Sequence, residues 1–175
     1  MKIFKNAFIL LSVLLFSCKS ENSLEHYFVS NEDNDDFVII DVPVSMVKNA
    51  VNLSKEEKKA IESVKKLSVL YFKNDKKKNE EYLKQKQSLM HILKSDKYQT
   101  LSKFKTGNTK IDIKFIGTDD AIDEIVLFAN DKNFGFLLAR ILGNKMNPND
   151  MQLLLKNIQN MNFDLKQLKN LNLNL

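Results

Sequence analysis

Residues 111–142, IDIKFIGTDDAIDEIVLFANDKNFGFLLARIL, decide the fold class of this chain. Apolar and polar side chains alternate from Ile111 to Phe115, which predicts a strand with one buried face. Two short polar turns then bound two further apolar runs, and we expect strands over 122–129 and 134–142. Turns of this length favour hairpins, so the second half of the chain is predicted to be rich in sheet.

Upstream of this stretch, two more strands flank a helical segment. The β-branched run FVIIDV at 37–42 predicts a buried strand, and the run LSVLYF at 67–72 predicts a second one. Between them, Ser54 and Glu57 have the spacing of a capping box, which predicts the start of a helix. Strand, helix and strand in this order form a βαβ unit, so we expect these two strands to be parallel.

The remaining apolar periodicity is helical. It predicts a helix over 80–94 and a further helical turn over 98–104, while Pro148 and Asp150 indicate the start of a closing helix. The expected order is β-α-β-α-β-β-β-α. This is an α+β fold, a mixed sheet of about five strands with helices packed on one face. We place this single domain at residues 37–160.

The N-terminal stretch MKIFKNAFILLSVLLFSC has the features of a bacterial secretory signal. A basic start precedes an apolar stretch of about ten residues, which is too short to span a bilayer. Leu15 and Ser17 precede Cys18 as they do in a lipobox, the recognition sequence of the lipoprotein signal peptidase. We therefore expect residues 1–17 to be removed and Cys18 to receive acyl chains. Two or three acyl chains, at about 0.8 kcal/mol per buried CH₂, anchor a protein stably.

Two segments outside the expected domain have a composition of their own. Residues 18–36 begin with the lipidated cysteine and continue with an acidic, asparagine-containing run, which predicts a flexible tether. Residues 161–175 are rich in asparagine and leucine, and the spacing of the leucines changes partway along this tail.

Composition narrows the classes of function. The chain has 175 residues, a formal net charge of +5, one cysteine and two histidines. A single cysteine excludes a disulfide framework and a multi-cysteine metal site. Two histidines leave little material for a histidine-ligated metal, and the sequence contains no glycine-rich phosphate loop, nucleophile elbow or zinc-protease motif. We expect no catalytic residues, no metal and no cofactor.

The densest group of carboxylates is formed by Asp119, Asp120, Asp123 and Glu124. A cation site or an acid–base pair is one interpretation of such a group. The spacing of a calcium-binding loop is absent, however. A solvated turn followed by an outward-facing strand residue is the simpler interpretation, and we expect it to apply.

The histidines and the basic residues also have two interpretations each. A general base needs a nucleophile and an orienting partner, and the spacing supplies neither for His91, at a helix edge, or for His26, in the tether.

Lysine is in excess over residues 37–110, which predicts either a solvated face or a contact with the phosphates of lipid headgroups or lipid A. Arg140 is the only arginine, and nucleic-acid readers favour arginine, so we expect no nucleic-acid partner.

Three segments resemble a family of uncharacterised Gram-negative lipoproteins that is described as a domain of unknown function. They are FVIIDVPVSMV at 37–47, VKKLSVLYF at 64–72, and the strand at 122–127 with the apolar run that follows it to Gly143. The resemblance covers about 37–160. It implies an envelope location and the extent of the domain, and it supplies no activity and no site residues.

These features predict a lipid-anchored, non-enzymatic protein of the cell envelope that acts as a binding or accessory module. Its expected location is the periplasmic face of the outer membrane, with surface exposure left open. Its expected partners are the membrane itself, through the anchor, and another envelope protein or anionic lipid. The alternative is a lipoprotein that senses the state of the envelope by binding a small ligand.

Overall fold

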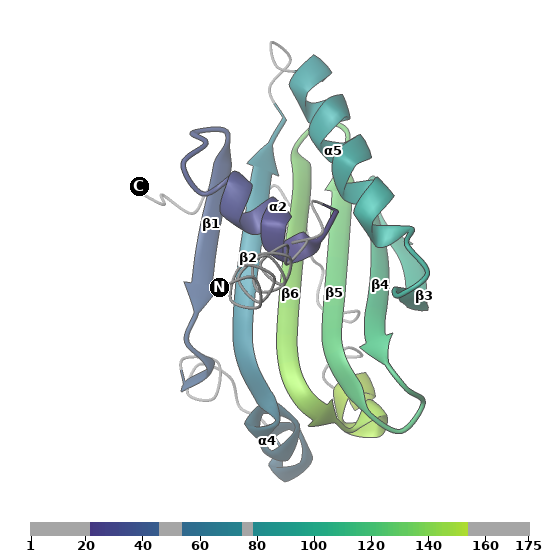
Figure 1. Ribbon diagram of the computed structural model, residues 1–175. Coiled ribbons are helices and arrows are strands. Elements are labelled where there is room, and N and C mark those ends of the chain that lie inside the picture. The colour runs from purple at the N-terminus through teal and green to yellow at the C-terminus, as the bar shows by residue number, and fades with distance from the viewer. Residues whose placement is uncertain (1–21, 46–53, 75–78, 154–175) are drawn as a thin grey trace, which may run out of the picture.

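The computed structural model describes residues 22–45, 54–74 and 79–153. These residues form a six-stranded sheet with the order β1-β2-β6-β5-β4-β3 (Figure 1). The strands are β1 (Phe37–Val42), β2 (Val64–Lys73), β3 (Gln99–Thr106), β4 (Thr109–Gly117), β5 (Ile122–Asp131) and β6 (Gly135–Met146). The helices are α2 (Leu24–Ser30), α4 (Lys55–Glu62) and α5 (Asn79–Leu93), and residues 148–153 begin another.

The expected mixed sheet of about five strands is wrong, because the sheet has six strands and all of its pairs are antiparallel. The predicted parallel pair is β1 and β2, which instead run antiparallel in the register Phe37 to Phe72. Helix α4, with the predicted capping box at Ser54 and Glu57, has eight residues and is therefore about 12 Å long. Only Ser63 separates it from β2, and β2 begins at the end of the sheet where β1 stops, since Val42 pairs with Leu67.

The helical turn expected over 98–104 is also wrong, because residues 99–104 belong to the edge strand β3. Tyr98, Leu101 and Phe104 are three residues apart, which imitates helical spacing. Along β3, exposed and partly buried side chains alternate instead. The pairing with β4 decides the outcome, since strand propensity depends strongly on tertiary partners.

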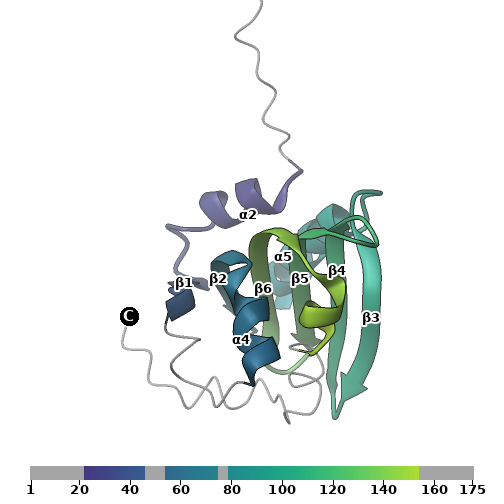
Figure 2. The same ribbon diagram turned by 90° about the horizontal axis from the view of Figure 1, so that it is seen from below.

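Helices lie on both faces of the sheet, so the expectation of helices on one face only is wrong as well. Helices α2 and α5 cross the face seen in Figure 1, whereas α4 lies on the side of the sheet opposite α2 in Figure 2. Buried side chains of α2, α5 and the strands form the first core. Ala60 of α4 and Met151 belong to a second core on the other face.

The second core follows directly from the strand registers. Alternate residues of neighbouring strands fall on the same face, so apolar side chains form rows across the sheet. One row contains Ile111, Ala129, Leu137 and Tyr71, and the next contains Ile113, Leu127, Ala139 and Val69. The strands that the sequence predicted over 37–42, 67–72, 111–115, 122–129 and 134–142 are confirmed.

Residues 24–30, which the composition assigned to the tether, form helix α2. Ser23 caps this helix by accepting a hydrogen bond from the backbone N–H of His26 at 3.1 Å. Leu24 and Tyr27 are buried in the first core, and the Tyr27 hydroxyl donates to Gln85 Oε1 of α5 at 3.0 Å. The folded part of the chain therefore begins close to Cys18.

We expect Gly135→Ala to lower the free energy of unfolding by about 2 kcal/mol, because Gly135 has φ +111° and an added Cβ would overlap the backbone of Phe72. The matched control is Gly107→Ala. Gly107 has φ +56° with no atom within 4 Å of an added Cβ, so about 1 kcal/mol is expected. Urea unfolding followed by circular dichroism measures both, and equal losses would contradict the proposed backbone overlap at Gly135.

Candidate functional site

A hollow of about 430 Å³ lies between helix α5 and the ends of strands β3, β4 and β5. In an antiparallel meander the β3–β4 and β5–β6 turns lie at the same end of the sheet, and this is the end where the hollow opens. Its lining is Lys86 and Met90 of α5, Lys105, Asn108, Lys110 and Asp112 from β3, β4 and their turn, and Phe128, Asn130, Asp131, Lys132 and Asn133 from β5 and its turn. We call this the lysine hollow.

Positive charge dominates the lysine hollow. Its four lysines face two aspartates, and no described carboxylate oxygen lies within 4.0 Å of any of the four ammonium groups. Burial lowers the pKa of Lys86, and repulsion from Lys110 and Lys132 lowers this pKa further. The Lys86 ammonium lies 5.6 Å from the centre of the Tyr82 ring, which attracts it weakly.

The rim of the lysine hollow is held in place by hydrogen bonds from residues outside it. Asn74 Nδ2 donates to the backbone oxygen of Lys132 at 2.6 Å, and the Tyr71 hydroxyl donates to the oxygen of Phe134 at 2.8 Å. On its floor, Asn130 accepts a hydrogen bond from the buried Tyr82 hydroxyl. The β5–β6 turn, which carries one of the lysines, is therefore preorganised.

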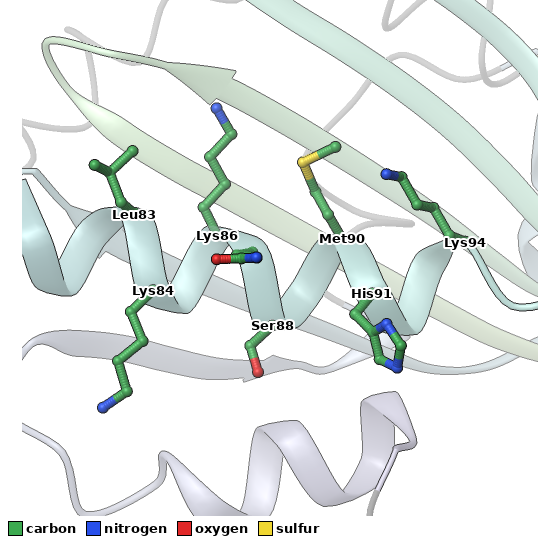
Figure 3. A pocket seen from close by; sticks show the side chains of 8 residues that line it. Leu83, Lys84, Lys86, Ser88, Met90, His91 and Lys94 are labelled. Atoms are coloured by element: carbon green, nitrogen blue, oxygen red, sulfur yellow. The ribbon is translucent and has the colours of Figure 1, made fainter.

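A second hollow, of about 790 Å³, extends along the exposed side of α5. Figure 3 shows its described lining, which comes entirely from α5, with Leu83, Lys86, Met90 and Lys94 on one side and Lys84, Ser88 and His91 on the other. His91 is exposed, and its ring points away from Met90 and Lys94. The described lining comes from a single convex helix and offers no converging groups, so this hollow is the weaker candidate for a binding site.

A buried ion pair lies on the α5 face of the sheet. Arg140 Nη2 of β6 is 2.9 Å from Glu124 Oε2 of β5, and the Tyr98 hydroxyl donates to Glu124 Oε1 at 3.0 Å. Burial and the Glu124 charge raise the pKa of Tyr98, so its hydroxyl stays protonated at neutral pH and serves as a donor. Among the described residues, Arg140 Nε is buried without an acceptor.

The structure separates the acidic residues that the sequence grouped. Asp119 and Asp120 are exposed in the β4–β5 turn, and exposed Asp123 accepts a hydrogen bond from the Lys145 backbone at 3.4 Å. Glu124 is buried beside Arg140 instead of facing outward. Within the described residues, no group of three or more acidic, histidine or cysteine side chains is placed to hold a metal ion.

Of the other residues named in the sequence analysis, some lie outside the described part of the chain and one lies in α2. Leu15, Ser17 and Cys18 lie outside the described residues, as do residues 161–175. His26 is exposed in the first turn of α2. No helix among the described residues is long and apolar enough to cross a membrane.

Sequence reasoning missed both the lysine hollow and the buried ion pair. The lysine excess over 37–110 indicated positive charge, but Lys132 lies outside that range and the four lysines come from separate segments. For the ion pair, a signal existed in the unusual position of Glu124 and Arg140 within otherwise apolar strands.

Comparisons with known proteins give one match. The sequence model of a family described as "Domain of unknown function (DUF4252)" matches residues 27–154. Neither the curated proteins nor the solved structures contain a match to this chain. The matched range includes the whole sheet, the lysine hollow and the buried ion pair.

Proposed function

Because the chain belongs to the family described as "Domain of unknown function (DUF4252)", which names no activity, we propose a role from its own residues. The protein is a lipid-anchored, non-enzymatic component of the cell envelope, and its domain is a binding module. The observation that carries this proposal is the lipobox-like run Leu15 to Cys18 directly before a folded domain that contains a charged, preorganised hollow.

The short distance between anchor and domain supports a role at the membrane surface. Helix α2 begins at Leu24, and six residues of extended chain reach about 20 Å at most. Acyl chains on Cys18 would therefore hold the domain next to the lipid headgroups. The periplasmic face of the outer membrane is the proposed location.

The lysine hollow supports a role in binding. Its described lining combines charged and amide side chains with the apolar Met90 and Phe128, as the lining of a ligand site does. Its volume lies within the range of small-molecule sites. This volume favours a second candidate function, the sensing of a small ligand in the envelope.

Lipidation is tested by metabolic labelling with an alkyne-bearing fatty acid. The wild-type chain should carry the label and Cys18→Ala should lose it, because the thiol is the acceptor of the diacylglycerol. Ser17→Ala is the matched control, since it keeps a small residue before the cysteine and should label as the wild type does. Equal labelling of wild type and Cys18→Ala would overturn the proposed anchor.

A further inference from the structure

The four lysines of the lysine hollow converge from separate segments of the chain. Lys86 comes from α5, Lys105 from β3, Lys110 from β4 and Lys132 from the β5–β6 turn. A solvated lysine face on one helix requires no such convergence. Bringing like charges together costs free energy, which a bound anion would recover.

The two aspartates of the hollow offset only part of this charge, because the described residues show no ion pair between them and the four lysines. Asp131 is 3% exposed, and its Oδ1 accepts a hydrogen bond from the backbone N–H of Asn133 at 2.8 Å. Asp112 is partly buried on β4, and no described ammonium group lies within 4.0 Å of its carboxylate. The lysines therefore keep their capacity to pair with an added anion.

The other lining residues set the chemistry of that anion. Asn108 and Asn133 offer amide donors at the turns, while Met90 and Phe128 give the floor an apolar part. Several lysines suit a phosphate, which carries up to two charges and accepts hydrogen bonds at several oxygens. A carboxylate carries a single charge and two acceptor oxygens, so it would engage fewer of the four ammonium groups. The sole arginine, Arg140, does not line the hollow.

We propose that the lysine hollow is a binding site for a phosphate group, with Lys86, Lys110 and Lys132 as its principal ligands. This inference deepens the proposed function and rests on it, since it names the chemical class that the binding module recognises. The phosphate belongs either to a lipid headgroup or to a small phosphorylated molecule. The two sources share the same recognition chemistry.

The test titrates the full chain, purified in a neutral detergent, with glycerol 3-phosphate and with soluble dihexanoyl phosphatidic acid. Backbone amide shifts of Asn108 and Asn133 report binding at the hollow, and the thermal midpoint reports the stabilisation that a ligand brings. Saturable shifts and a raised midpoint are expected. Dihexanoyl phosphatidylcholine, whose phosphate charge is balanced by choline, should cause neither.

Charge-matched variants decide whether the hollow itself is responsible. Lys86→Gln, Lys110→Gln and Lys132→Gln combined should weaken binding about tenfold or more, because charged hydrogen bonds are lost. The control combines Lys55→Gln, Lys58→Gln and Lys59→Gln on α4, which removes the same charge at exposed positions. Its affinity should stay within about twofold of wild type.

Two outcomes would overturn the inference: no saturable binding by the wild-type chain, or equal weakening in the two triple variants. If the hollow variant fails to fold, Lys110→Gln alone replaces it and should still weaken binding about threefold.

Tighter binding of phosphatidic acid than of glycerol 3-phosphate would identify a lipid headgroup, and equal binding would identify a small phosphorylated molecule. Phosphate binding by the hollow does not require lipidation of Cys18. A negative result in one experiment therefore leaves the result of the other unaffected.

Discussion

Replacing Phe136 with alanine is expected to lower the free energy of unfolding by about 4 kcal/mol. Phe136 is fully buried at the centre of the first core. Its ring stacks on Phe72 at 5.2 Å between centroids and lies 5.9 Å from Phe128 and 6.2 Å from Tyr82. Removing the ring leaves a cavity bounded by these side chains, and rigid strands on either side prevent the site from collapsing.

Chemical unfolding of the purified chain, followed by far-ultraviolet circular dichroism, measures this loss. Leu83→Ala is the matched control, because Leu83 is 52% exposed on α5 and its truncation should cost about 0.5 kcal/mol or less. A loss below about 1 kcal/mol in Phe136→Ala would show that the aromatic cluster does not form the main core.

Arg140→Ala is expected to cost about 3 kcal/mol, because it leaves the buried Glu124 carboxylate without its counter-ion. The Glu124 side chain is only 8% exposed, so its charge would be poorly solvated without the guanidinium. The Tyr98 hydroxyl still donates to the carboxylate, but a neutral donor compensates for only part of the lost charge.

Two further variants separate the buried charge from other effects of the substitution. Lys66→Ala breaks the exposed pair with Asp41, whose atoms are 2.9 Å apart, and should cost less than about 1 kcal/mol. The double variant Glu124→Gln with Arg140→Met removes both charges and keeps an acceptor for Tyr98, so it should regain at least half of the loss. If the double variant is as unstable as Arg140→Ala, the cost lies in packing and not in the charge.

Five of the six strands could be predicted from the sequence because each carries a local signal, whereas the helix-like spacing of Tyr98, Leu101 and Phe104 concealed β3. Alternation from Ile111 to Phe115 and the β-branched run at 37–42 depend only on neighbouring residues, and both predicted strands form. The capping box at Ser54 is equally local. These elements form as predicted because side-chain periodicity and helix capping depend only on residues a few positions apart.

Strand direction and the faces that the helices cover were predicted wrongly because they depend on contacts between distant residues. Strand β6 is inserted between β2 and β5, and no local pattern indicates that insertion. Helix α2 was assigned to a tether because of the acidic, asparagine-containing run at 31–36 that follows it, although four of the seven residues of α2 are apolar. Its burial depends on Tyr27 reaching Gln85, which is 58 residues away.

The features of the candidate site also fall into two groups, those set by the local sequence and those set by tertiary contacts. The family, the lipobox-like run before Cys18 and the overall excess of lysine are properties of the sequence itself, since each is a matter of residue identity and short spacing. The lysine hollow and the pairing of Glu124 with Arg140 were decided by the tertiary structure. The physical reason is that a binding site and a buried charge pair need groups from different strands and helices, and only the antiparallel registers of the sheet bring those groups within a few ångströms.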